Sequence, residues 1–258
     1  MKKIAMLFIL LLFSINVFAQ TNEEKKALGQ ANNPLANSTA FNIQNYYYSK
    51  LAGTENIANT SWLRYVAPLF KGRVIIRASA PFPTKIPVND TDYKSGLGNM
   101  NIFGAYIVSK DGAPATIGLG PLVVAPTVTE NMGSNKWQAG GAFVYFNAKS
   151  TQVQFGGLVT YQHSVGGSSD DPTVNAGAIQ PFYFFQLGGG TYLRGAPIWL
   201  LDFENNLYNV PIGLGIGKVV KVGKTMFNMF IEPQYVIYNK GNGLPLFSIY
   251  AGLNMQFY

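Results

Sequence analysis

The sequence has no cysteine, a single histidine and little charge, and each scarcity removes a class of protein. Without cysteine there are no disulfide bonds, no thiolate metal ligands and no lipid-anchored N-terminal cysteine. One histidine leaves no cluster of imidazole ligands for a metal ion. Charged residues make up 12% of the chain, about half the usual share for a soluble domain. We therefore expect no metal site and no cofactor.

Long apolar runs are missing beyond the N-terminus. There, Lys2 and Lys3 precede an apolar stretch from Ile4 to Phe13, and Val17-Phe18-Ala19 follows it. This order is typical of a secretory signal peptide over residues 1–19, cleaved after Ala19. The stretch is about half as long as a spanning helix, which disfavours the alternative of an uncleaved anchor. We therefore expect an exported chain of 239 residues.

The remaining chain is basic. Its net charge falls from +7 to +5 when Lys2 and Lys3 leave with the signal peptide. The Lys and Arg residues are scattered, and an exported chain does not meet nucleic acid, so that partner is excluded. Anionic lipid headgroups or an anionic solute are the partners that the charge allows.

Polar residues dominate positions 20–42, where Asn and Ala are frequent. We interpret this stretch as a periplasmic N-terminal extension. The alternative is that it folds back into the mouth of the following domain as a small plug.

From residue 43 onward the sequence alternates with a period of two, which indicates β-strands. In the last twelve residues, Phe247, Ile249, Ala251, Leu253, Met255 and Phe257 form one apolar face. Twelve residues is the length of a tilted membrane strand. We count twelve such runs, over residues 43–50, 59–69, 72–80, 97–108, 114–126, 136–147, 152–165, 175–188, 190–204, 208–221, 224–238 and 245–258.

Short and longer connections largely alternate between these runs. That alternation is typical of an outer-membrane barrel with both termini in the periplasm. We predict an all-β fold, an antiparallel up-and-down transmembrane β-barrel of twelve strands over residues 43–258. Counts of ten or fourteen stay open, because the first run alternates poorly and Pro197 lies within another.

A soluble β-sandwich or lipocalin-like barrel is the competing fold. Its exposed faces would carry Lys, Glu and Asp, whereas here the less apolar face carries Gly, Asn, Gln, Ser and Thr. Aromatic residues near strand ends also fit the headgroup level of a bilayer. The last strand ends in Phe257-Tyr258, and we expect the barrel-assembly machinery to read it.

Alternation predicts that most charged strand residues face the lumen, because a charge near the bilayer midplane costs about 2–4 kcal/mol on the lipid face. Two roles compete for them: Arg–carboxylate pairs that close the interior, or an arginine ladder that selects anions. We expect Arg64 and Arg77 to line a path. The predicted lumen-facing residues are Arg64, Arg73, Arg77, Arg194, Asp202, Glu204, Glu232 and Gln234.

Hydrolase chemistry is the enzymatic alternative for a barrel of this size. His163 and Ser164 are adjacent, so a strand points them to opposite faces. A nucleophilic serine needs a histidine base, and the sequence offers no other. We therefore expect no enzymatic activity.

Several segments resemble one family of outer-membrane proteins. They are Ser95-Gly96-Leu97-Gly98-Asn99-Met100-Asn101-Ile102, Gly118-Leu119-Gly120-Pro121, Lys136-Trp137-Gln138-Ala139-Gly140, Gln180-Pro181-Phe182, Tyr208-Asn209-Val210-Pro211-Ile212-Gly213-Leu214-Gly215 and Gly252-Leu253-Asn254-Met255-Gln256-Phe257. They are similar to the outer-membrane transporters grouped as the MetA-pathway of phenol degradation family.

The resemblance spans residue 33 to the C-terminus. It implies an outer-membrane barrel that passes small, aromatic or apolar organic solutes, and it supplies no catalytic residues. A non-conducting structural or surface-interaction barrel is the alternative function.

Overall fold

The computed structural model describes residues 30–257 except 90, 111 and 131. The predicted signal peptide and residues 20–29 lie outside this part of the chain. No helix among the described residues is long and apolar enough to cross a bilayer. The elements are β1 (Thr39–Leu51), β2 (Ala58–Leu69), the 3-10 turn η1 (Phe70–Gly72), β3 (Val74–Pro87), β4 (Tyr93–Lys94), β5 (Asn101–Ile107), β6 (Ala115–Val124), β7 (Trp137–Asn147), β8 (Val153–Gly166), β9 (Asn175–Gly188), β10 (Thr191–Gly195), β11 (Trp199–Asp202), β12 (Leu207–Gly213), β13 (Gly215–Val222), β14 (Thr225–Lys240) and β15 (Pro245–Phe257).

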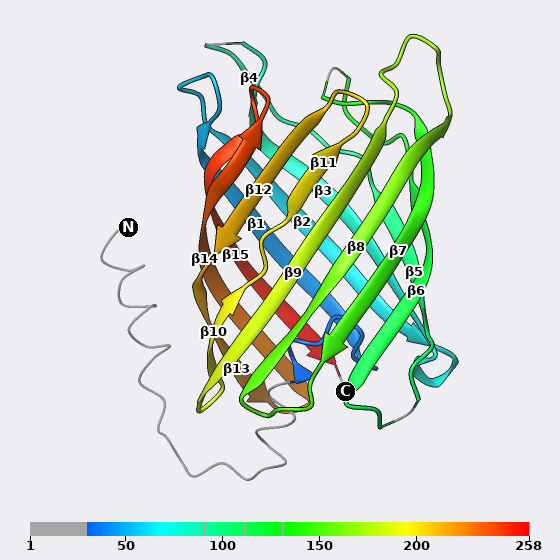
Figure 1. Ribbon diagram of the computed structural model, residues 1–258, viewed down its shortest axis with the longest axis vertical. Coiled ribbons are helices and arrows are strands. Elements are labelled where there is room, and N and C mark those ends of the chain that lie inside the picture. The colour runs from blue at the N-terminus through cyan, green and yellow to red at the C-terminus, as the bar shows by residue number, and fades with distance from the viewer. Residues whose placement is uncertain (1–29, 90, 111, 131, 258) are drawn as a thin grey trace.

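The strands form one closed antiparallel barrel (Figure 1). Neighbours in sequence pair with one another, and β1 pairs with β15 to close the ring. β10 and β11 are the two halves of one interrupted strand, as are β12 and β13, while β4 pairs with β3 outside the ring. The described wall therefore has twelve strands. The predicted fold class and strand number are confirmed.

Several strands begin or end away from their predicted positions; β5, for example, starts at Asn101 rather than at residue 97, and pairing explains the bounds of β1 and β3. β1 starts at Thr39 rather than at residue 43, because its ladder with β15 continues until Thr39 lies opposite Phe257. β3 runs on to Pro87, past the predicted end at residue 80, because its ladder with β2 continues until Lys85 lies opposite Asn59, and Ile86 then pairs with Lys94 of β4. In both places the pairing partner sets the boundary.

The two ends of the barrel differ in the length of their connections (Figure 1). One end carries η1 and the short connections 148–152, 189–190 and 223–224, and β15 finishes there. We call it the turn end. The opposite end, the loop end, carries the longer connections, among them 125–136 and 167–174. Bacterial outer-membrane barrels have this asymmetry.

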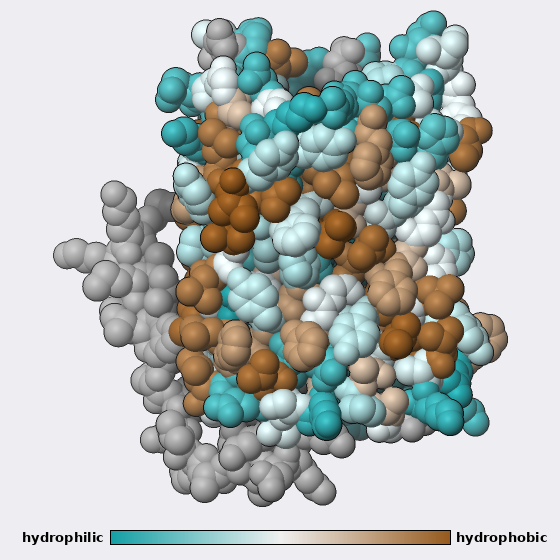
Figure 2. All heavy atoms as spheres, in the orientation of Figure 1, coloured by the Kyte–Doolittle hydropathy of each residue, from teal (hydrophilic) through white to brown (hydrophobic). Residues whose placement is uncertain are grey.

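The wall is apolar outside, whereas its inner face mixes apolar residues with polar and charged ones. Along β14, Ile231 and Tyr235 are exposed, whereas Glu232 and Gln234 are buried. Figure 2 shows apolar and aromatic residues across the middle of the outer face, with hydrophilic residues gathered towards both ends. Such a belt fits the hydrocarbon layer of a membrane. The soluble alternative, whose exposed faces would carry Lys, Glu and Asp, disagrees with this apolar outer face.

The backbone ladder is interrupted between β10 and β11 and between β12 and β13. Proline has no N–H to donate, and Pro197 lies in the first of these breaks. Lipid offers no hydrogen bonds, so the freed backbone groups need partners within the protein. Side chains provide them: Trp199 Nε1 donates to Pro211 O (3.0 Å), Gln180 Nε2 to Ala196 O (3.0 Å) and the Tyr183 hydroxyl to Gly213 O, while Glu232 Oε1 accepts from Ala196 N (2.9 Å).

Residues 30–38, which we call the N-terminal segment, pack inside the wall at the turn end. Ala31 O accepts hydrogen bonds from Asn228 Nδ2 and Gln256 Nε2, both at 3.2 Å. Leu35 is buried in the same apolar cluster as residues of the inner wall. A Cβ atom on Gly118 would lie 3.2 Å from Leu35 Cδ1. This inward-facing glycine therefore makes room for the segment.

Candidate functional site

Three cavities follow one another through the barrel, and neighbouring cavities share lining residues. The vestibule (about 990 Å³) opens at the loop end, among residues 128–135, 170–177 and 200–207 and Leu244. The middle chamber (about 360 Å³) shares Ser134, Val174 and Leu200 with the vestibule. The inner chamber (about 140 Å³) lies against the N-terminal segment. The middle and inner chambers share Arg64, Arg77, Phe103, Leu158 and Gln180.

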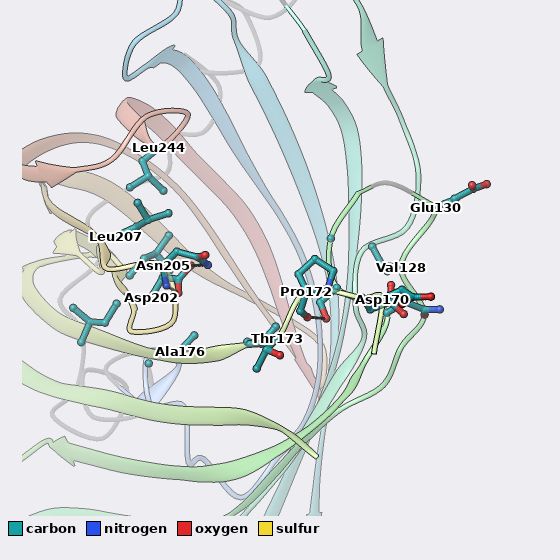
Figure 3. Close-up of a pocket in the computed structure, with 18 residues that line it drawn as sticks. Val128, Glu130, Asp170, Pro172, Thr173, Ala176, Asp202, Asn205, Leu207 and Leu244 are labelled. Atoms are coloured by element: carbon teal, nitrogen blue, oxygen red, sulfur yellow. Dashed lines mark hydrogen bonds between the residues drawn. The ribbon is translucent and has the colours of Figure 1, made fainter. Parts of the chain in front are cut away.

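The vestibule is bordered by carboxylates on loops and at the end of β11. Figure 3 shows Asp202, at the end of β11, and Asn205, of the β11–β12 connection, on one side and Asp170 and Pro172 on the other. Asp202 accepts hydrogen bonds from Asn205 N (2.9 Å) and Asn205 Nδ2 (2.8 Å). The structure therefore places Asp202, predicted to face the lumen, at its wide loop end, where its carboxylate holds its own turn.

The middle chamber combines apolar and uncharged polar walls. Its apolar lining comes from Trp62, Phe103, Leu122, Val124, Leu158, Val174, Ala178, Ile198 and Leu200. Its uncharged polar lining comes from Ser79, Asn99, Asn101, Ser134, Gln138, Thr160, Gln162 and Gln180. Among the described residues, the charged side chains that line it are Arg64 and Arg77, with no Asp or Glu.

Arg64 on β2 and Arg77 on β3 lie where the middle and inner chambers join. In the ladder, Arg64 is opposite Ser79 and Arg77 is opposite Val66. The two arginines are therefore diagonal neighbours on the inner face, close enough for their long side chains to reach one another. This is the part of the predicted arginine set that the fold brings together at a narrow level of the lumen.

Neither guanidinium at this level meets a carboxylate among the described residues. Arg64 Nη1 donates to Gln44 Oε1, and its guanidinium lies 4.9 Å from the Trp62 ring centroid. The Arg77 guanidinium lies 4.4 Å from the ring centroid of Phe103. Nε of each arginine is buried without a hydrogen-bond partner. Both cations therefore keep unused hydrogen-bonding capacity inside the barrel.

Arg194, in contrast, has a buried counter-ion. Its Nε donates to Glu232 Oε2 over 2.8 Å, and both side chains are nearly inaccessible to solvent. Gln234 Nε2 donates to Glu232 Oε1 over 2.7 Å. The Arg194 guanidinium also lies 3.5 Å from the ring centroid of Phe230. Arg194 lines the inner chamber, but its charge is balanced within the wall, as the structural interpretation of these residues expects.

Two further predicted lumen residues lie away from the narrow lumen. Arg73 is exposed at the turn end, where Nη1 donates to Ser109 O over 3.2 Å. Glu204 is exposed in the β11–β12 connection at the loop end. Alternation gives the direction of a side chain, but these positions lie where the strands have reached the ends of the barrel.

Sequence reasoning did not single out Ser79, Trp62, Phe103 or Gln44 as site residues. Ser79 follows Arg77 by two positions, so the same alternation that turns Arg77 inward also turns Ser79 inward. Its hydroxyl is buried without a hydrogen-bond partner. The contacts of Trp62, Phe103 and Gln44 with the arginines could not be read from the sequence, because they depend on rotamers and register.

The enzymatic alternative gains no support from the fold. His163 is exposed on β8, and the Ser164 hydroxyl accepts a hydrogen bond from Val174 N over 2.8 Å. Among the described residues, no group of three or more His, Cys, Asp or Glu side chains could hold a metal ion.

Comparison with solved structures identifies proteins of the same fold. The chain is similar to an outer-membrane channel from Pseudomonas putida F1, with 12% identity, 86% of this chain and 96% of that chain covered, and a TM-score of 0.59. It is also similar to the NanC porin, with 11% identity, coverage of 84% and 99%, and a TM-score of 0.53. No protein-family model and no curated protein matches the sequence. The chain therefore has the fold of an outer-membrane β-barrel.

Proposed function

We propose that this protein is a channel of the bacterial outer membrane through which small solutes pass passively. The observation that carries the proposal is the series of three cavities with shared walls, from the open loop end to the N-terminal segment. A closed barrel with a packed interior would have no such series. The shared fold with an outer-membrane channel and a porin supports the same role.

The solutes in this proposal are small organic molecules with an aromatic or apolar part. The lining of the middle chamber supports this choice, since Trp62, Phe103 and Leu158 offer apolar contacts. The resemblance of the sequence to the MetA-pathway of phenol degradation family points the same way. We propose membership of that family on the segments that carry the resemblance.

Export through a cleaved signal peptide over residues 1–19 belongs to the proposal, as does assembly in the outer membrane. The apolar belt of the outer face supports a lipid environment (Figure 2). We propose that the barrel-assembly machinery recognises β15, which ends at Phe257. The loop end then faces the outside of the cell, and the turn end faces the periplasm.

The N-terminal segment narrows the inner end of this path. Ala31, Asn33 and Leu35 are buried against the wall, and the inner chamber beside them is the smallest of the three. In our proposal, residues 30–38 of the predicted extension over residues 20–42 act as a plug, while residues 39–42 belong to β1. A solute that crosses the barrel must pass this segment or displace it.

Single-channel recording of the refolded mature protein in a planar bilayer tests the proposal. We expect small stepwise conductance from the native chain and larger conductance from Leu35→Asp. An ionised carboxylate in that buried position costs several kcal/mol, enough to release the segment. Asn37→Asp is the matched control, because it adds the same charge at an exposed position of the segment. It should conduct like the native chain.

A folded barrel without conductance, both as the native chain and as Leu35→Asp, would reject the channel and leave the non-conducting structural barrel. Heat-modifiable migration on gels shows that each sample is folded. The small volume of the inner chamber is the observation that favours the non-conducting barrel as the second candidate.

A further inference from the structure

The junction between the middle and inner chambers gathers hydrogen-bond donors that lack acceptors. Arg64 Nε, Arg77 Nε and Ser79 Oγ are all buried without a partner. Ser79 lies opposite Arg64 in the ladder, and no Asp or Glu among the described residues lines the middle chamber. Asn42 Oδ1, opposite Arg64 on β1, is also buried without a partner, but one amide oxygen cannot satisfy three donors. Buried polar groups in folded proteins are nearly always satisfied, so these donors indicate a missing acceptor.

The positive charge at this junction also indicates a missing anionic partner. Two guanidinium groups on adjacent strands share a confined space, and among the described residues no Asp or Glu lines either the middle or the inner chamber. A buried cation without a counter-ion is costly, and a second cation beside it adds repulsion. A bound anion would remove both costs.

The walls above the junction limit the kind of anion. Trp62 and Phe103 lie beside the two arginines, and Leu122, Leu158 and Ile198 continue the apolar lining. The chamber volume, about 360 Å³, falls within the usual range for a small-molecule pocket, ~300–1,000 Å³. A compact anionic head with an apolar body matches this lining better than a fully hydrated inorganic ion.

We propose that the middle chamber binds small amphipathic organic acids, with the carboxylate between Arg64, Arg77 and Ser79 and the apolar body towards Phe103 and Leu158. Guanidinium groups form strong charge-assisted hydrogen bonds with carboxylates, and the Ser79 hydroxyl adds a donor. The inference deepens the proposed channel function and rests on it for the route by which the ligand arrives. Binding itself is measured without transport.

Isothermal titration of the refolded mature protein in detergent tests the site. The probe is benzoate, and the comparison ligand is benzamide, which has a similar shape and no charge. We expect benzoate to bind at least about tenfold more tightly than benzamide, because a charge-assisted contact with a buried cation is lost in the amide. Equal affinities would overturn the proposal.

The variants Arg64→Met and Arg77→Met should each weaken benzoate binding by more than about tenfold, while benzamide binding changes little. Arg73→Met is the matched control, because it removes an arginine at the exposed turn end, and it should bind both ligands like the native chain. If either chamber variant fails to fold, Arg64→Lys and Arg77→Lys keep the charge but lose bidentate geometry, and should retain part of the affinity.

Inorganic phosphate separates an organic-acid site from a general anion filter. Phosphate binding as tight as that of benzoate would overturn the amphipathic part of the proposal. The channel and the site also fail separately. Conductance without benzoate binding rejects the site alone, whereas binding without conductance rejects the channel and keeps the site.

Discussion

Two sites inside the same wall hold arginine in opposite ways. Arg194 on β10 has Glu232 as a counter-ion and Gln234 as an additional partner of that carboxylate. Arg64 and Arg77 on β2 and β3 have aromatic rings and an amide oxygen as neighbours, but no carboxylate among the described residues. The first arrangement is complete within the protein, whereas the second becomes complete with a ligand.

The difference follows from what each site must do for the fold. The Arg194–Glu232 pair lies at the interrupted part of the wall, and Glu232 also accepts the hydrogen bond from Ala196 N, in the gap between β10 and β11. The regular ladder between β2 and β3 needs no side chain to complete it. Its inward arginines have no carboxylate partner among the described residues, and in our proposal they hold a solute.

The largest effect is expected when the Arg194–Glu232 ion pair is broken. Glu232→Gln would leave Arg194 as a buried cation without a counter-ion, which typically costs about 3–5 kcal/mol of folding stability. Urea unfolding in lipid vesicles, followed by tryptophan fluorescence, measures the loss. Glu204→Gln, at an exposed position, is the control and should stay within about 0.5 kcal/mol of the native chain.

The double variant Arg194→Leu/Glu232→Leu sharpens this test. It removes both charges, so it should lose less stability than Glu232→Gln despite the larger change in composition. If the single and double variants unfold alike, the pair is not what stabilises this part of the wall.

At the site of Arg64 and Arg77, removing a charge should not lower the folding stability. Arg77→Met removes a half-buried cation that has no counter-ion in the described part of the chain, so stability should stay within about 1 kcal/mol of the native chain or rise. At the same time the preference of the channel for anions should fall. Reversal potentials in a potassium chloride gradient measure that preference. A loss of stability as large as that of Glu232→Gln would show that Arg77 has a structural partner.

The two sites show which features the sequence predicts, namely the direction of a side chain, and which it does not, namely its partner. Alternation predicts the number of strands and turns Arg64, Arg77, Arg194 and Glu232 inward, because a period of two is a local property of the chain. Pairing is not local. Arg194 and Glu232 are 38 residues apart, and they meet because Arg194 lies opposite Gly215 of β13, the strand between β10 and β14, where glycine puts no side chain between them.

The position of Asp202 has a related explanation. The predicted run over 190–204 continues through Pro197, but the structure divides it into β10 and β11. Asp202 is the last residue of β11 and lies at the loop end, where its carboxylate accepts hydrogen bonds from Asn205. Alternation alone gives no depth along the barrel axis, so the sequence could not separate this residue from those at the narrow level.

A smaller effect is expected when a carboxylate is introduced beside Arg64 and Arg77. Ser79→Asp would place one opposite Arg64 and diagonal to Arg77. Stability should rise by about 1 kcal/mol, the net value of a typical hydrogen bond, and anion preference and benzoate binding should be lost. Ser79→Asn is the neutral control and should keep the anion preference. Unchanged selectivity in Ser79→Asp would mean that the solute passes elsewhere.

The smallest effect is expected from the carboxylates of the vestibule. Asp170 and Asp171 lie in the β8–β9 connection, around an opening of about 990 Å³, where water and salt screen their charge. Asp170→Asn/Asp171→Asn should raise anion permeability by less than about twofold at physiological salt, where the screening length is ~8 Å. The change should vanish at ~1 M salt, where that length is ~3 Å. The influence of Arg64 and Arg77 should survive the same salt, because ions screen charges in a narrow chamber less effectively. A vestibule effect that persists at high salt, or exceeds that of Arg77→Met, would place the selective step at the loop end.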